Sequence, residues 1–373
     1  MYSMGIIGLP NVGKSTLFNA LTQAAAAAFN YPFCTIEPNI GIVAVPDARF
    51  DSVVAAVQSE KVTPAAIQFV DIAGLVRGAS KGEGLGNQFL AHIREVDALI
   101  HVVRCFPDEN VSHVEGAELD PVRDIDIVQT ELLLADIQRL ENMTERLTRL
   151  QKTGETKYKD ELRLVQDVME QLNNGRPARN MSFTESQKKL VDSWLLLTSL
   201  PMLYCANVTP EQFLEIQNAE EHRHLDSPYA EVLDLSSEEG AGCIAIAAQL
   251  EAELQELDEE ERQEFLTELG FPTSGLLRLI RASYRQLDLV TFYTIKGPET
   301  RAWIIPRGTT APKAAGRIHS DMERGFIRAE VLEAGSLVEL GSFSKAREEG
   351  VLRSEGKDYL VQDGDVMLIR FNV

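Results

Sequence analysis

The chain alternates between short apolar runs and amphipathic segments. The apolar runs predict buried strands at residues 4–7, 40–45, 65–70, 99–104 and 201–206. Between and after them, helical spacing predicts a helix from the first strand to about residue 28, followed later by a strand at 231–235 and a helix at 243–257. Alternating strands and helices predict an α/β fold with a parallel sheet.

The pattern changes between residues 121 and 200. Apolar residues recur at helical spacing through charged surroundings up to Leu150, and a second such run follows Gly154. A third helix is expected at about 185–197. Because the α/β pattern resumes afterwards, we expect an α-helical hairpin inserted into the α/β domain, with a charged face that is usually solvated surface.

From Leu289 onward, short β runs replace the longer helices. They lie at 290–294, 302–305, 327–331 and 366–371, with one helix expected over 310–322 and a connecting helix over 259–285. A small sheet that packs on one helix is a ubiquitin-like α+β module. The expected domains are therefore a nucleotide-binding domain at 1–120 and 200–286, a helical insertion at 121–199 and a C-terminal module at 287–373.

Composition adds constraints on cellular location. The 373 residues are 44% hydrophobic and 25% charged, as in soluble globular proteins. No apolar run approaches the length of a membrane span, and the first strand begins too early for a signal peptide. The cysteines form no CxxC pair, which predicts neither a disulfide framework nor a zinc site. We therefore expect a cytoplasmic protein without a membrane partner.

The formal net charge of −21 argues against a nucleic-acid binder if the charge is uniform. It is not uniform, because residues 288–373 hold 12 Lys/Arg and 13 Asp/Glu. Seven basic residues lie between Lys296 and Arg328. This locally basic stretch is consistent with RNA contact and equally with a solvated face.

The segment Gly8-Leu9-Pro10-Asn11-Val12-Gly13-Lys14-Ser15-Thr16 follows the first strand and precedes a helix. Glycines five residues apart, followed by Lys and Ser, are typical of a P-loop. Its backbone N–H groups, from Asn11 to Thr16, would bind phosphates, Lys14 would contact the β/γ-phosphates, and Ser15 would hold Mg²⁺.

Two further segments have the spacing of a nucleotide switch. Thr35 lies in a proline-containing loop and is expected to complete the Mg²⁺ shell. Asp71 ends a buried strand and is expected to hold Mg²⁺ through water, while Gly74 would donate its N–H to the γ-phosphate. The glycine-rich residues 75–87 that follow predict a mobile switch loop.

These motifs, with others along the chain, resemble the YchF (Obg-like) ATPases of the translation-factor class. The resemblance rests on residues 8–16, 31–39, 71–76, 101–106, 113–116, 301–303, 310–319, 325–327, 356–359 and 362–365. It implies a G-type nucleotide domain, an inserted hairpin and a C-terminal TGS domain. It also implies ATP and Mg²⁺ as ligands, and the ribosome, through its large subunit or ribosomal RNA, as partner; no DNA partner is expected.

The segment expected to recognise the nucleotide base differs both from the GTPase motif and from the motif of the resembled family. GTPases place Asn-Lys-x-Asp after the fifth strand, whereas this chain has Asn207-Val208-Thr209-Pro210. Without the acceptor Asp, guanine loses hydrogen-bond partners that adenine does not need. The family resemblance implies ATP, with Asn207 and the Val208 backbone at the base, but Pro210 stands where the family has Glu, so a GTPase of the same fold remains an alternative. Phe106 could stack on the base or belong to the core.

Hydrolysis lacks its usual water-orienting group, because Leu75 replaces the Gln of ordinary GTPases. The resemblance leaves two candidates. Asn11 would help to hold K⁺, a fixed positive charge near the phosphates, and His113 could position the water. A ribosome-binding adaptor, in which nucleotide is only a structural ligand, remains a different class of function.

Overall fold

The computed structural model describes residues 1–28, 39–72, 85–107, 119–151, 156–218, 227–271 and 273–372. The chain forms two compact units. The large unit comprises Tyr2–Gly41 and Gln68–Ser283, and the C-terminal unit comprises Met1, Ile42–Ile67 and Tyr284–Val373. No described helix combines the length and low charge that a bilayer-spanning segment requires.

The sheet at the centre of the large unit has the strand order β2-β4-β1-β5-β6-β7. Its strands are β1 (Ser3–Ile7), β2 (Ile40–Ala44), β4 (Ala66–Asp71), β5 (Ala98–Arg104), β6 (Met202–Asn207) and β7 (Gly242–Ile246). From β4 to β7 neighbouring strands pair in parallel, and every residue of β1, β5 and β6 is buried. The expected α/β class is confirmed. The carboxyl ends of these strands share one edge, where such sheets bind ligands.

The helices of this α/β region are α1 (Lys14–Ala28), α3 (Leu85–Ile93), α7 (Pro210–Asn218), α8 (Pro228–Glu238), α9 (Ala248–Leu254), α10 (Glu259–Glu268) and α11 (Gly275–Gln286). The expected strand at 231–235 is wrong, because it lies inside α8. Ser227 caps that helix by accepting from the Ala230 N–H, and Pro228 occupies its first turn. The last strand of the sheet is β7, which occupies the start of the helix expected at 243–257.

Two other expected helices are interrupted. The helix expected at 259–285 is split into α10 and α11, with Gly270 between them in a left-handed conformation (φ 77°). The helix expected at 310–322 is split into α12 (Ala311–Ile318) and α13 (Ser320–Arg324). His319 has extended backbone there, and its ring accepts from the Asp321 N–H, which caps α13.

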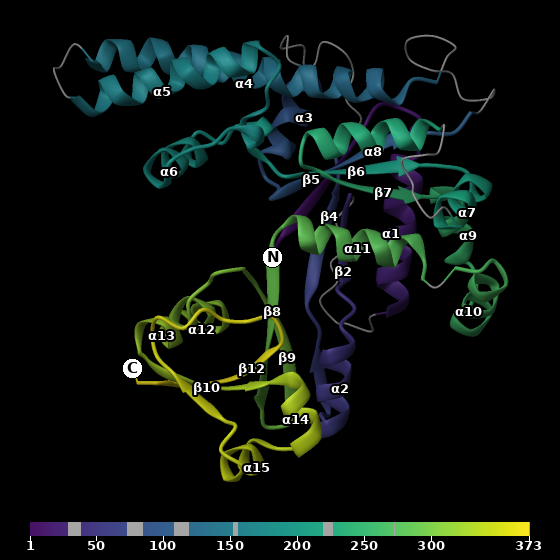
Figure 1. The fold of residues 1–373 in the computed structure, drawn as a ribbon, viewed down its shortest axis with the longest axis vertical. Helices are drawn as coiled ribbons and strands as arrows, with labels where there is room; N and C mark the ends of the chain where they lie inside the picture. The colour runs from purple at the N-terminus through teal and green to yellow at the C-terminus, as the bar shows by residue number, and fades with distance from the viewer. Residues whose placement is uncertain are drawn as a thin grey trace. The chain divides into compact units, whose positions relative to one another are not determined.

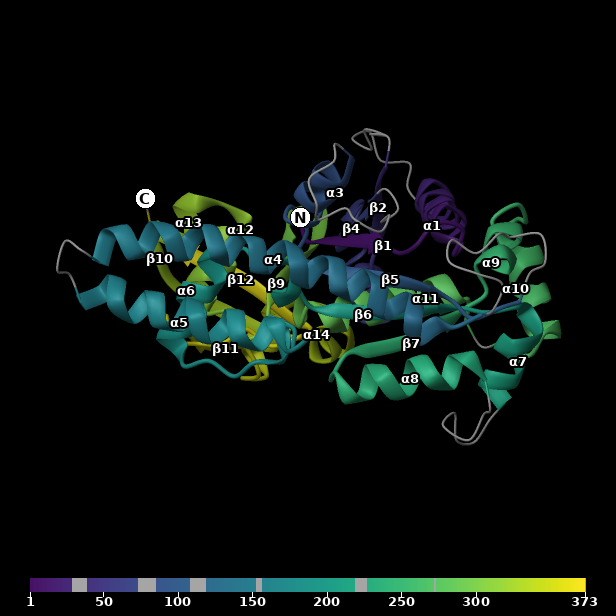
Figure 2. The same cartoon turned by 90° about the horizontal axis from the view of Figure 1, so that it is seen from above.

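The helical insertion consists of α4 (Pro121–Gln151), α5 (Thr156–Asn173) and α6 (Glu185–Ser193), with short 3₁₀ turns at Ala178–Asn180 and Leu197–Ser199. Figures 1 and 2 show α4 and α5 side by side as a long arm. Leucines of α4 and α5 form a core with Trp194. The buried Asp136 carboxylate of α4 accepts from the backbone N–H groups of Leu197 and Thr198, which fixes the returning chain on the arm.

The C-terminal unit is built on a second sheet with the order β11-β10-β12-β8-β9-β3. Its strands are β3 (Lys61–Thr63), β8 (Leu289–Lys296), β9 (Glu299–Pro306), β10 (Phe326–Glu333), β11 (Arg353–Glu355) and β12 (Asp365–Phe371). Its helices are α2 (Ala48–Val57), α12, α13, α14 (Ala334–Leu340) and α15 (Phe343–Glu348). Alanines of α12 pack on Phe292 and Val331 in the core of this sheet. The expected combination of a small sheet and a packed helix is present.

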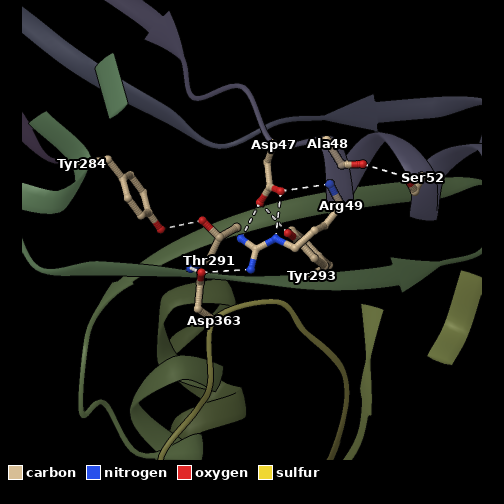
Figure 3. Close-up of polar contacts among 8 residues, drawn as sticks. All are labelled: Asp47, Ala48, Arg49, Ser52, Tyr284, Thr291, Tyr293 and Asp363. Atoms are coloured by element: carbon tan, nitrogen blue, oxygen red, sulfur yellow. Dashed lines mark hydrogen bonds and ion pairs between the residues drawn. The ribbon is translucent and has the colours of Figure 1, made fainter. Parts of the chain in front are cut away.

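Residues 42–67, which we assigned to the nucleotide-binding domain, form part of the C-terminal unit. The short strand β3 pairs in parallel with β9. In Figure 3 the Arg49 guanidinium of α2 lies between Asp47 and Asp363, with a distance of 2.9 Å from its Nη1 to the Asp363 carboxylate. The Tyr293 hydroxyl of β8 donates to Asp47. Strand pairing and this polar cluster therefore hold the segment against the C-terminal sheet.

Candidate functional site

The P-loop connects β1 to α1 at the carboxyl edge of the large sheet. Asn11 and Gly13 have left-handed backbone conformations, with φ of 63° and 91°. Such reversals turn successive N–H groups toward one side and create a concave anion-binding backbone. The adjoining α1 begins at Lys14, so its free N–H groups face the same region.

Both motif glycines are required by close packing. A Cβ at Gly8 would lie 2.6 Å from the Val102 carbonyl oxygen of β5. A Cβ at Gly13 would lie 2.1 Å from the Asn207 Nδ2 atom, and φ at Gly13 also disfavours an L side chain. The loop therefore lies directly against the ends of β5 and β6.

Lys14 and Asp71 form an ion pair within this site. Pairing of β1 with β4 sets Ile6 opposite Asp71, which brings the carboxylate to the end of the sheet beside the P-loop. The Lys14 side chain is 10% exposed and that of Asp71 is 15% exposed. The pair therefore compensates two charges that would be costly to bury alone.

Asn207 connects the end of β6 to the P-loop. Its side chain donates to the Val12 carbonyl at 2.9 Å and accepts from the Ala248 N–H at 3.0 Å. Asn207 is 4% exposed, so both bonds are shielded from water. We expected Asn207 at the base; the structure adds a bracing contact that sequence reasoning missed, because Val12 and Ala248 are distant from it in the sequence.

Pro210 has a structural reason for its position. It is the first residue of α7, where its missing N–H costs nothing. Thr209 and Gln212 form the cap of this helix, since each side chain accepts from the other residue's N–H. Hydrogen bonds from its own backbone and from Thr209 lower the pKa of the Glu211 carboxyl, so this carboxylate is engaged at the helix start.

The donor set fits a Mg²⁺–nucleotide complex. The cradle exists because Gly8 and Gly13 carry no Cβ, and Lys14 supplies a cation beside it. Ser15 is exposed at the start of α1, so its hydroxyl is accessible, and Asp71 provides a carboxylate nearby. Mg²⁺ in phosphate-binding sites takes few protein ligands of this oxygen type and keeps several waters.

The structure thus brings Asn11, Lys14, Asp71 and Asn207 together at the carboxyl ends of β1, β4 and β6, with β5 lying between β1 and β6. Four further sequence-based candidates lie outside the described residues: Thr35, Gly74, Leu75 and His113. Phe106 is partly exposed, and the Arg104 guanidinium lies over its ring at 5.1 Å.

A buried polar network links the arm to the same sheet. The Tyr204 hydroxyl of β6 donates to Glu239 at 2.7 Å, and Gln129 of α4 donates to the same carboxylate at 2.8 Å. Arg179 forms an ion pair with Glu239 at 3.2 Å. His101 of β5 packs by Tyr204, and burial, assisted by Arg179, lowers the pKa of His101 to about 3. The imidazole is therefore neutral at physiological pH.

Two family models match the chain. Residues 3–157 match the model MMR_HSR1, described as a 50S ribosome-binding GTPase. Residues 289–372 match the model YchF-GTPase_C, described as a protein of unknown function (DUF933).

Similar proteins cover the full length. The ribosome-binding ATPase YchF of Bacillus subtilis (strain 168) is 49% identical over 372 residues, which is 99% of each chain. The protein of the same name from Haemophilus influenzae is 48% identical and covers 100% of this chain and 99% of its own. The solved Schizosaccharomyces pombe YchF GTPase is 34% identical, covers 99% of this chain and 97% of its own, and superposes with a TM-score of 0.86.

Proposed function

This chain belongs to the YchF family, and from that premise we propose that it is a Mg²⁺-dependent P-loop ATPase that acts as a nucleotide switch on the ribosome. The observation that carries the proposal is the P-loop itself. Its left-handed backbone, Lys14 and Asp71 meet beside Asn207 at one edge of the sheet.

Phosphate binding depends on the loop and the start of α1. The N–H groups from Asn11 to Thr16 would contact the phosphates, and Lys14 would stabilise negative charge as it develops on the transferring phosphoryl group. The ion pair with Asp71 keeps the Lys14 ammonium close to the loop. Low intrinsic turnover is expected because Leu75 cannot orient water.

The Mg²⁺ ion would be held by Ser15, by Thr35 and, through water, by Asp71. When bound, it would supply charge neutralisation at the phosphate oxygens. Gly74 would donate its N–H to the γ-phosphate, so that Thr35 and Gly74 follow the nucleotide state. Asn11 would additionally help to hold K⁺, with His113 as the alternative group that positions water.

Selectivity for ATP is supported by the groups after β6. A guanine-reading Asp is missing there, Pro210 starts a helix, and the Glu211 carboxylate is engaged at that helix start. Guanine would leave buried donors unmatched at a cost of about 1–3 kcal/mol each, whereas adenine would not. The name GTPase on the Schizosaccharomyces pombe relative favours the alternative of a GTPase.

We further propose a division into a nucleotide-binding domain at 1–120 and 200–286, a helical insertion at 121–199 and a TGS domain at 287–373, with the correction that residues 42–67 pack with the C-terminal unit. Ribosome binding would involve the large subunit or its RNA, in line with the description of the model that matches residues 3–157. A cytoplasmic location follows from that partner.

The proposal is tested by ATP hydrolysis with and without purified ribosomes. Wild-type protein should hydrolyse ATP slowly and sediment with ribosomes. The Lys14→Ala variant should lose hydrolysis and any difference in sedimentation between ATP and ADP. Equal sedimentation of wild-type protein with both nucleotides would favour the adaptor class instead.

A further inference from the structure

Three arginines of the C-terminal unit converge on one glutamate. Glu330 of β10 accepts from Arg347 of α15 at 2.9 Å and from Arg370 of β12 at 3.1 Å, and Arg328 lies 3.5 Å from it. We call these four residues the Arg328–Arg347–Arg370 cluster, with Glu330 at its centre. Among the described residues, Glu330 is the only carboxylate in an ion pair with these three guanidinium groups, which leaves an excess of two positive charges in the cluster.

The cluster is open to solvent at its charged ends. The arginine side chains are 54%, 59% and 47% exposed for Arg328, Arg347 and Arg370, whereas Glu330 is 9% exposed. Hydrogen bonding from Arg370 lowers the pKa of Glu330, so its charge persists in the cluster. The buried carboxylate thus holds three exposed guanidinium groups close together.

Strand pairing places two of these charges directly opposite each other. Arg328 of β10 is the register partner of Arg370 of β12, next to an irregularity between Phe326 and Arg328. Like charges in directly opposed positions destabilise a sheet. Glu330 lies beside both guanidinium groups and offsets part of this repulsion, while their exposed ends stay available to an anionic partner.

Three other basic residues of the same unit each pair with one carboxylate. Arg307 pairs with Asp288, Lys313 with Glu323 and Arg324 with Asp321. These pairs involve three of the seven basic residues between Lys296 and Arg328. The cluster differs from these pairs because three arginines share one carboxylate, in a chain whose net charge is −21.

We propose that the Arg328–Arg347–Arg370 cluster binds ribosomal RNA through its phosphate groups. The proposal rests on the proposed ribosome association and deepens it by naming the contact surface. Planar guanidinium groups match phosphate oxygens in a two-pronged geometry. Because the rest of the chain is acidic and repelled by phosphates, an RNA contact requires a local positive surface of this kind.

The test uses two variants with equal charge change in the same unit. Arg328→Gln/Arg347→Gln removes two arginines of the cluster and keeps the Arg370–Glu330 bonds, whereas Arg307→Gln/Arg324→Gln removes two compensated arginines. Binding of the full chain to purified ribosomes and to protein-free ribosomal RNA is measured from about 50 to about 200 mM KCl. ATP hydrolysis without ribosomes serves as a folding control.

We expect the cluster variant to bind RNA and ribosomes about tenfold or more weakly, with the slope of log K against log salt smaller by about 1.5. The control variant should bind like wild type. Arg347→Glu alone, on a surface helix, should weaken binding further than Arg347→Gln, which keeps the proposal testable if the double variant fails to fold.

Three results would overturn the proposal. Equal binding of both double variants rejects the cluster while leaving ribosome association intact. Weaker ribosome binding with unchanged RNA binding assigns the surface to an acidic ribosomal protein. Wild-type protein that binds neither ribosomes nor RNA rejects the proposed function together with this inference.

Discussion

Asn207 donates a hydrogen bond of 2.9 Å to the backbone carbonyl of Val12. The bond joins the end of β6 to the middle of the P-loop across 195 residues of sequence. The same side chain accepts from the N–H of Ala248, at the start of α9. The Asn207 side-chain amide therefore positions both the P-loop and the start of α9, besides its expected role near the base.

Replacing Asn207 with Ala should weaken ATP binding and lower stability. The Val12 carbonyl and Ala248 N–H lose their shared partner in a buried site, which costs about 2 kcal/mol. Calorimetric titration with ATP and urea unfolding measure the two effects. Glu215→Ala, an exposed change within α7, is the control and should leave ATP binding and unfolding nearly unchanged. If Asn207→Ala has the ATP affinity and the free energy of unfolding of the wild type, Asn207 does not brace the P-loop.

Gly13→Ala should disrupt the contact between Asn207 and the P-loop, because the change lies in the loop itself. The added Cβ would meet Asn207 Nδ2 at 2.1 Å, and the left-handed φ of 91° adds strain of about 1–2 kcal/mol. We expect a large loss of ATP affinity and a lower Tm. At Gly335, in α14, a Cβ meets nothing within 4 Å, so Gly335→Ala should keep or raise stability by about 0.5 kcal/mol. Equal effects at the two glycines would contradict the packing argument.

Arg49→Met should destabilise the C-terminal unit by about 1 kcal/mol, since Arg49 is 45% exposed and its pairs are partly screened. Lys61→Met, which breaks a more exposed pair on the same segment, is the control and should cost less. Unfolding of the C-terminal unit can be followed by Trp303 fluorescence in a Trp194→Phe background. A larger effect at Lys61 would argue against the cluster shown in Figure 3.

The Arg49 effect should also depend on pH. Burial raises the pKa of Asp47, but hydrogen bonds from Arg49 and Tyr293 outweigh it and lower the pKa below its usual 3.8. The carboxylate therefore contributes stability above about pH 3.8, which is lost as the pH falls. The difference between wild type and Arg49→Met should shrink below that pH.

His101→Gln should reduce the dependence of the free energy of unfolding on pH below about pH 6.5. The pKa of His101 is lowered from 6.5 to about 3 by burial, so the unfolded chain takes up a proton before the folded one does. Wild-type stability should fall as the pH drops from 6.5 toward 3, and this component should be missing in the variant. His92→Gln, at an exposed position of α3, controls for the loss of one imidazole in the same pH series of urea unfolding.

Local patterns identified much of the site. The P-loop, the strand that ends at Asp71 and the helix that begins at Lys14 all depend on neighbouring residues, so the sequence predicts them well. The strand expected at 231–235 failed because helix capping by Ser227 outweighed the apolar pattern. The Ala-rich run that contains β7 suits a helix by composition, but pairing with β6 makes its first part a strand.

Other features depend on contacts between distant segments, which leave no local signal. Nothing near Arg49 indicates Asp363 as its partner, 314 residues away. Arg347 and Arg370 lie outside the basic stretch that the sequence singled out, and only the folding of β10, β12 and α15 unites them with Arg328.

The central claim, that this family member binds ATP in preference to GTP, is tested most directly by calorimetric titration of both nucleotides with Mg²⁺ and K⁺ present. Our account predicts at least about tenfold tighter binding of ATP, equivalent to about 1.4 kcal/mol. Equal affinities, or tighter binding of GTP, would contradict it and would show that the segment from Asn207 to Pro210 does not select adenine.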